Sequence, residues 1–355
     1  MYFTDTYFHD FRNLRRGRVS WDGRVNLIIG HNGAGKTNFI EGLNIISGWG
    51  PISRGVKISS LPRWGGGGAA SLWARAAGEE DADIFASVSG RCSLKIGDRA
   101  ASASSMRLVI PVMTFLSDGM AVITGSSSAR RALLDRVGAL AVPGYAEALG
   151  GYKRALKQKS VLLRQRRSAY SADRVMSPLC GEIWLARVKI VSMIEEALEN
   201  FSELLPHPIG LSFVKGGSSA GSQICGFDEL LSVNAERERA SGYALVGAQR
   251  DDVGIACGGM EACRFLSRGQ SRRAAAALIL ASALAVERAA KRKPVLIFDE
   301  VTSELDAEGR VLLLGALVKT ECQVFAATAD EIGYAGASVR RMAGGSFLKP
   351  QVDKF

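Results

Sequence analysis

The sequence predicts an α/β protein in which the N-terminal and C-terminal segments complete one mixed sheet flanked by helices, with a mainly helical lobe inserted between them. Three observations carry this prediction. An apolar strand, a glycine-rich turn and an amphipathic helix follow one another over 25–47. A second apolar strand, at 295–298, runs into two carboxylates. Between them, from about 128 to 205, helix-forming residues dominate.

Composition narrows the class of protein. Of the 355 residues 47% are apolar, which excludes a disordered chain, and the six cysteines are scattered as in a reducing compartment. No stretch reaches the roughly 18 apolar residues of a membrane span, and no signal peptide is evident, so we expect a cytoplasmic protein without a membrane partner. The formal net charge of +10 is compatible with nucleic-acid binding and equally with a solvated basic surface.

The remaining elements follow from local patterns. The glycine run 65–68 and the Gly/Ser-rich stretch 215–226 predict loops, and 69–115 reads as strand-rich. Strands are expected at 243–247, 294–298 and 323–328, and helices at about 269–291 and 307–319. The sequence therefore predicts three ranges, namely a sheet-forming half at 1–118, the helical lobe at 119–242 and a second sheet-forming half at 243–355.

The glycine-rich turn carries a complete phosphate-binding motif. The run from Gly30 to Thr37 fits G-x-x-x-x-G-K-[ST] at every fixed position. Glycines let backbone N–H groups surround a phosphate chain, the helix N-terminus adds partial positive charge, and Lys36 can reach the β- and γ-phosphates. The alternative is an accidental glycine-rich turn. The predicted ATP-binding residues are Gly30, Asn32, Gly33, Ala34, Gly35, Lys36, Thr37 and Asn38.

A distant pair of carboxylates completes this site. Asp299 and Glu300 follow the apolar strand, where they would organise Mg²⁺ and polarise the attacking water. A solvated acidic pair is the alternative. Asp299 comes 263 residues after Lys36, much farther than in small kinases and GTPases, so a long insertion splits the site. The predicted catalytic residues are Lys36, Asp299 and Glu300, and the predicted Mg²⁺ ligands are Thr37 and Asp299.

Two further segments resemble ATPases of the ATP-binding-cassette type. Ser267, Gly269 and Gln270 stand at the start of a predicted helix and resemble the signature motif, which caps from one subunit the γ-phosphate held by the other. An ordinary helix N-cap at Ser267 is the alternative, and the two roles are compatible. Ser303 and Asp306 resemble the D-loop at the interface of such dimers.

Matches in order along nearly the whole chain resemble the RecF family of bacterial recombination mediators. They are Phe8–Leu14, Thr37–Glu41, Phe115–Asp118, Arg130–Arg136, Tyr152–Lys159, Gly247–Asp252 and Gln323–Asp330. The departures are a missing proline at 117–119, Ala248-Gln249 in place of Pro-His, and Glu300 where a second Asp is common. The resemblance implies a P-loop NTPase of the ABC/SMC type, with a split ATPase head at 1–118 and 243–355 and a helical lobe at 119–242.

The resemblance also implies a function. It implies an ATP-dependent homodimer that clamps double-stranded DNA at gaps or single-strand/double-strand junctions. With RecO and RecR this dimer would load RecA onto strands coated by single-strand-binding protein, in repair and replication restart. Slow, DNA-stimulated ATP hydrolysis would reset it, with ATP and Mg²⁺ as cofactors. Arg12 is expected either to contact the nucleotide or to pin the first strand.

A basic segment offers a DNA contact. Residues 151–172 contain seven Lys and Arg and no acidic residue, which is typical of sequence-independent, salt-dependent phosphate binding. Because the segment lacks acids, the sequence argues against a salt-bridged helix, and a solvated basic face is the alternative. The predicted DNA contacts are Lys153, Arg154, Lys157, Lys159, Arg164 and Arg166.

Two other functions share these motifs. The ATPase subunit of an ABC-type transporter has the same P-loop, serine motif and Asp-Glu pair, but it needs a membrane partner. Another compact SMC-like ATPase, of toxin or antiphage type, usually carries an effector domain. The ordered matches and the basic segment favour the recombination mediator over both.

Overall fold

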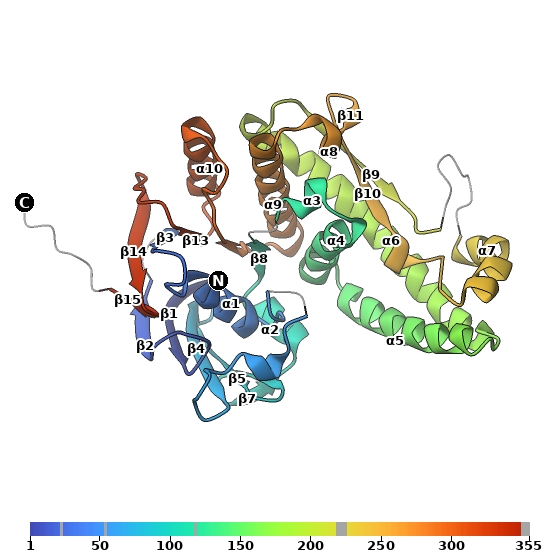
Figure 1. Ribbon diagram of the computed structural model, residues 1–355, viewed down its shortest axis with the longest axis horizontal. Coiled ribbons are helices and arrows are strands. Elements are labelled where there is room, and N and C mark those ends of the chain that lie inside the picture. The colour runs from blue at the N-terminus through green and yellow to red at the C-terminus, as the bar shows by residue number, and fades with distance from the viewer. Residues whose placement is uncertain (22–23, 53–54, 117–118, 218–225, 349–355) are drawn as a thin grey trace, which may run out of the picture. The chain divides into compact units, whose positions relative to one another are not determined.

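A computed structural model describes residues 1–21, 24–52, 55–116, 119–217 and 226–348. The chain divides into two compact units, the first formed by 1–119 with 286–355 and the second by 120–285 (Figure 1). Residues 243–285, assigned from the sequence to the second half of the head, group with the second unit. Ser117, Asp118 and most of the predicted 215–226 loop lie outside the described residues. The division of the chain into an ATPase head at 1–118 and 243–355 and a helical lobe at 119–242 stays a prediction.

The first unit contains a mixed six-stranded sheet to which both ends of the chain contribute. Its order is β15-β14-β3-β13-β12-β8, with β15 antiparallel to β14 and the other neighbours parallel. The central strands are buried along their whole length, as parallel strands covered on both faces are. The strands are β3 (Val25–Ile29), β8 (Val112–Phe115), β12 (Val295–Phe298), β13 (Val324–Thr328), β14 (Ala337–Ala343) and β15 (Ser346–Phe347).

An antiparallel sheet of six strands covers the other side of the same core. Its strands are β2 (Gly17–Ser20), β1 (Tyr2–His9), β4 (Ala70–Ala77), β5 (Ala82–Val88), β6 (Cys92–Ile96) and β7 (Arg99–Ala101), in that spatial order. Its inner-face residues, such as Leu72 and Ile84, join Phe39 and Leu43 of α1 (Lys36–Ile46) in one apolar cluster. The short helices η1 (Ile58–Ser60) and α2 (Ala103–Val109) and the helix α10 (Ala307–Lys319) complete the unit.

The second unit is mainly helical, as the sequence predicts. A small antiparallel sheet, β11-β10-β9, lies among its helices. Its elements are α3 (Ala121–Thr124), α4 (Ser127–Ala141), α5 (Tyr145–Arg164), α6 (Tyr170–Leu198), η2 (Glu199–Leu204), β9 (Ile209–Val214), α7 (Phe227–Ser241), η3 (Ala248–Arg250), β10 (Asp252–Cys257), β11 (Met260–Glu261) and α8 (Ala262–Phe265), with α9 (Arg268–Ala290) continuing into the first unit. No helix within the described ranges is both long and apolar enough to cross a bilayer.

One predicted strand is wrong. Residues 243–247 form no strand, although their apolar pattern suggests one. The backbone N–H groups of Leu245 and Val246 donate instead to the side chain of Glu238, at 2.7 and 3.2 Å. A buried carboxylate therefore takes the backbone donors that a neighbouring strand would otherwise satisfy.

Candidate nucleotide-binding site

The P-loop lies between the end of β3 and the start of α1, as predicted. Gly33 and Gly35 have φ angles of +80° and +109°, which favour glycine. At Gly30 a Cβ would lie 2.3 Å from the carbonyl oxygen of Met342, so no larger residue fits there. The loop therefore needs its glycines for its backbone shape and for the close approach of β14.

Lys36 points back into the loop. Its Nζ donates to the carbonyl oxygens of Gly30 and, at 3.1 Å, His31. Burial lowers the pKa of Lys36, and the charges of Asp299 and Glu300 oppose that shift. The ammonium group therefore lies inside the glycine-rich turn and within the field of both carboxylates. A bound phosphate chain would replace the two carbonyl oxygens as its hydrogen-bond acceptor.

The two halves of the predicted site meet directly. The hydroxyl of Thr37, in the first turn of α1, donates to Asp299 at the end of β12, at 3.0 Å to Oδ2 and 3.2 Å to Oδ1. Asp299 is 2% exposed, and its burial, with a contribution from Glu300, raises the pKa of its carboxyl group while Thr37 opposes the rise. A hydroxyl and a carboxylate beside a phosphate-binding turn are the oxygen ligands that Mg²⁺ prefers, so these residues fit the ion.

The segment after Asp299 is a tight turn that ends in a capped helix. Glu300 has a φ of +51°, uncommon for a residue with a Cβ, and its carbonyl oxygen accepts from the N–H of Ser303 at 3.1 Å. Asp306 is the N-cap of α10 and accepts from the N–H of Gly309 at 2.8 Å. Asp306 therefore has a structural role in its own chain, and the predicted interface role of Ser303 and Asp306 stays a prediction.

Sequence reasoning missed three side chains beside this turn. The hydroxyl of Thr302 lies 2.6 Å from that of Thr328 and 2.7 Å from the Asp330 carboxylate, which also pairs with Arg310 at 3.3 Å. These contacts join the ends of β12 and β13, neighbouring parallel strands whose carboxyl ends form one edge of the sheet. Asp330 is the last residue of the Gln323–Asp330 segment that resembles the RecF family. That resemblance was the sequence signal that could have pointed to this residue.

A second missed feature is the support of the P-loop by both ends of the chain. The amide of Asn13 donates to the carbonyl oxygen of Gly33 at 3.1 Å, and Asn38 donates to Asn13 at 2.8 Å. The N–H of Gly345, in the turn between β14 and β15, donates to Ala34 at 2.9 Å. Because these contacts join residues far apart in sequence, no local pattern predicts them.

Arg12 has the structural role that the sequence left open. Its N–H donates to Leu61 at 2.9 Å, and its Nε pairs with Glu41 of α1 at 2.8 Å. The Glu41 side chain is 3% exposed, so this ion pair pins the segment after β1 to the P-loop helix. Contact between Arg12 and nucleotide stays a prediction.

Ser267 is the N-cap of α9, the alternative role given above. Its hydroxyl accepts from the N–H of Gln270 at 3.3 Å, and the Gln270 side chain accepts from the N–H of Ser267 at 2.9 Å. This reciprocal pair is a capping box. The hydroxyl accepts in the box, so its own hydrogen can still be donated to an anion, and the signature role of Ser267, Gly269 and Gln270 stays a prediction.

The basic segment is only partly a solvated face. Lys153, Arg154, Lys157, Arg164 and Arg166 are exposed, with Arg166 just beyond the end of α5. Lys159 is completely buried and pairs with Asp173 at 2.8 Å and Glu238 at 2.6 Å. Its prediction as a DNA contact is therefore wrong. Other helices supply the acids that the segment itself lacks.

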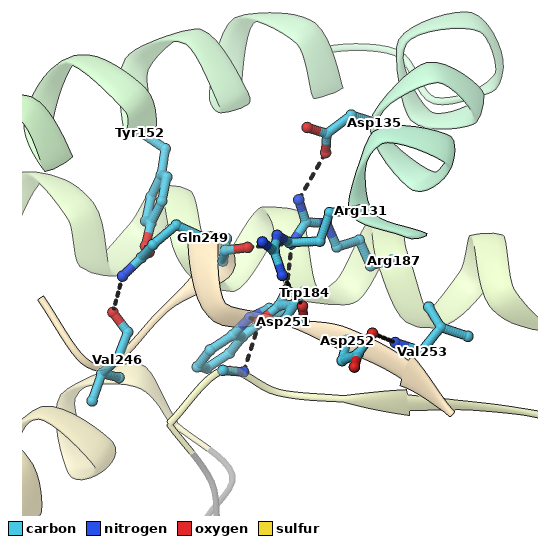
Figure 2. Close-up of polar contacts among 12 residues, drawn as sticks. Arg131, Asp135, Tyr152, Trp184, Arg187, Val246, Gln249, Asp251, Asp252 and Val253 are labelled. Carbon is cyan, nitrogen blue, oxygen red and sulfur yellow. Dashed lines mark hydrogen bonds and ion pairs between the residues drawn. The ribbon is translucent and has the colours of Figure 1, made fainter. Parts of the chain in front are cut away.

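The Gly247–Asp252 match forms a polar network inside the second unit (Figure 2). The buried guanidinium of Arg187 pairs with Asp251 and, at 2.7 Å, with Asp135, and Asp251 also accepts from the indole N–H of Trp184 at 2.9 Å. Gln249 lies in the position of the expected histidine, accepts from Tyr152 and donates to Val246 at 2.9 Å. The residues that carry this part of the resemblance thus hold α4, α5 and α6 against the segment before β10.

Comparison with known proteins shows which proteins this chain is similar to. No family model matches the sequence. The DNA replication and repair protein RecF of Myxococcus xanthus is 28% identical over 346 residues, covering 91% of this chain and 90% of the relative. RecF of Yersinia pestis is 28% identical over 366 residues, covering 99% and 100%.

Solved structures show the same fold. The recombination mediator protein RecF with ATP, from the RecFOR pathway, aligns with a TM-score of 0.86 at 21% identity, over 98% of this chain and 97% of that one. An Smc head bound to the C-winged helix domain of ScpA aligns with a TM-score of 0.58 at 15% identity, over 98% and 97%. The predicted ABC/SMC-type α/β fold is confirmed.

Proposed function

Because this chain is similar over nearly its whole length to DNA replication and repair proteins named RecF, we propose that it is a member of the RecF family and an ATP-dependent, DNA-binding recombination mediator. The observation that carries the proposal is the hydrogen bond between Thr37 and Asp299 beside a complete P-loop. It joins the phosphate-binding and metal-binding halves of an ATPase site across the sheet. The RecF structure with ATP supports the choice of nucleotide.

The residues of the site have distinct roles in ATP binding and hydrolysis. The backbone N–H groups from Asn32 to Asn38 surround the phosphates, and Lys36 leaves the loop carbonyls to contact the β- and γ-phosphates. Thr37 and Asp299 hold Mg²⁺, which neutralises phosphate charge when bound. Glu300 orients the attacking water and accepts its proton. Lys36 and Asp299 are buried, so the charges of these two side chains act more strongly than they would in solvent.

The site needs a second copy to be complete. In this proposal the α9 N-terminus of one protomer, with Ser267 and Gly269, caps the γ-phosphate that the other protomer binds. Ser303 and Asp306 of each protomer contact the partner protomer across the interface. The capping box supports this role because it orients the Ser267 hydroxyl and leaves the helix dipole directed at an anion. ATP thus holds two protomers together, and slow, DNA-stimulated hydrolysis releases them.

The closed dimer clamps double-stranded DNA at gaps or junctions, and with RecO and RecR it helps load RecA onto strands coated by single-strand-binding protein. The exposed cations of α5 support a phosphate contact that is independent of sequence. The similarity to a recombination mediator of the RecFOR pathway and to DNA replication and repair proteins supports this choice of pathway.

Light scattering with and without ATP and gapped DNA tests the proposal. Mg·ATP should double the molar mass, and gapped DNA should join the dimer only when ATP is present. A chain that stays monomeric with ATP bound at saturation would overturn the clamp. A chain that binds no ATP would overturn the nucleotide site itself.

A further inference from the structure

The outer face of the antiparallel sheet carries three aromatic side chains in a row between two basic ones. Directly paired positions on five adjacent strands form the row, which is Arg18 on β2, Tyr7 on β1, Trp73 on β4, Phe85 on β5 and Lys95 on β6. Their neighbours along each strand, such as Leu72 and Ile84, point inward and are buried. The row therefore lies on the face away from the core.

A hollow of about 710 Å³ lies along this row. The next row of the sheet forms its floor with the small side chains of Ser71, Ser87 and Ser93, which pair with one another across β4, β5 and β6. Phe85 is 38% exposed, large for an aromatic side chain. Flat rings beside hydroxyl groups suit a ligand with flat faces and polar edges, which is the chemistry of a nucleobase.

The cations above the rings suit an anionic ligand. The guanidinium of Arg18 lies 5.1 Å from the Trp73 ring centre, and that of Arg16 lies 5.9 Å from the Tyr7 ring centre. Arg18 also pairs with Asp5 at 3.0 Å, so the two charges offset each other, and Arg16 supplies the further positive charge on this side of the row. Of the lining residues that the structure describes, Asp98 alone is acidic, against Arg18 and Lys95. Positive charge thus borders an aromatic surface on both sides.

We propose that this sheet face binds a single strand of DNA, with bases stacked on Trp73 and Phe85 and phosphates beside Arg16, Arg18 and Lys95. The three rings lie on neighbouring strands and span about 10 Å, room for about two or three bases. A duplex keeps its base faces stacked inside, so it cannot use the rings. The proposal rests on the proposed function only in taking DNA as the polymer, and it needs neither ATP nor a dimer.

Fluorescence anisotropy of a labelled oligodeoxythymidylate of about 15 nucleotides, without ATP, tests the proposal. The wild-type chain should bind it more tightly than a blunt duplex of the same length. Phe85→Ser should weaken single-strand binding about tenfold, because it removes a stacking surface, with little change in salt dependence. Lys95→Ala should lower the slope of log affinity against log salt by about 1. Tyr2→Ser, an exposed aromatic outside the row, is the matched control and should bind as the wild type does.

Tryptophan fluorescence locates the contact. Stacking on Trp73 should quench part of the emission when the oligonucleotide binds, and Trp73→Phe should bind while losing that part of the quenching. Equal affinity for single strand and duplex, or unchanged binding by Phe85→Ser with intact ATP binding, would overturn the proposal. If a second copy of this chain occupies the face instead, dimers should form without ATP and Phe85→Ser should disrupt them. That result would also overturn the proposal. Because ATP-induced dimerisation is measured separately, failure here leaves the proposed function standing.

Discussion

The hydroxyl of Thr37 donates to Oδ2 of Asp299 at 3.0 Å, across 262 positions of the sequence. Strand order makes this possible, because β13 lies between β3 and β12 and all three are parallel. Their carboxyl ends therefore meet at one edge, where the P-loop turn and the acidic turn face each other. Two groups that can share one Mg²⁺ ion are thus positioned by the sheet.

Asp299→Asn should separate metal-dependent from metal-independent ATP binding. The amide keeps the shape of the side chain but removes the charge that favours Mg²⁺, so calorimetry should show ATP affinity reduced at least about tenfold with Mg²⁺ and nearly unchanged in EDTA. Asp306→Asn is the matched control, because asparagine caps a helix as well as aspartate does. Equal losses with and without Mg²⁺ would contradict the assignment of Asp299 to the metal.

Lys36→Met should abolish ATP-induced dimerisation. The variant keeps the length of the side chain but loses the ammonium that contacts the phosphates, so the dimer loses the ligand that joins its halves. Light scattering at increasing ATP concentration measures the effect. Dimers that persist with normal ATP affinity would be incompatible with the proposed role of the P-loop.

Glu300→Gln should trap the ATP-bound dimer on DNA. Glutamine can hold the water by a hydrogen bond but cannot accept its proton, so turnover should fall by about 10²–10⁴-fold while ATP binding stays. Phosphate release and the lifetime of the complex on gapped DNA report the two effects. Unchanged turnover would reject Glu300 as the base and leave its position after Asp299 without a catalytic role.

Replacing Arg154, Lys157 and Arg164 with alanine should flatten the salt dependence of DNA binding. These side chains are exposed on α5, and the slope of log affinity against log salt should fall by about 1 for each cation that no longer reaches a phosphate. Lys189→Ala, an exposed lysine of α6, is the control for general charge loss. A slope that stays the same in the triple variant would place the duplex contact on another surface.

The sequence predicted what local chemistry determines. The P-loop, the acidic strand end and the mixed sheet follow from patterns within single segments, and the structure has all three. Such local patterns could not predict the contacts between segments. Asn13 and Gly345 support the P-loop from opposite ends of the chain. Glu238 takes the backbone donors of Leu245 and Val246, where a strand was predicted. In each case a side chain or turn outside the segment itself determines the outcome.

Lys159→Met should change stability and leave DNA binding as it is. The substitution leaves Asp173 and Glu238 without the buried ammonium that lies within 2.8 Å of each, and breaking such a buried ion pair costs about 3–5 kcal/mol of unfolding free energy. Lys157→Met, an exposed neighbour on the same helix, should change stability by less than about 0.5 kcal/mol and lower the salt slope instead. Denaturant unfolding and DNA titrations on both variants separate the two roles. If Lys159→Met lowers the salt slope with unchanged stability, the lysine is a DNA contact after all, and the burial of α5 against α6 and α7 differs in solution.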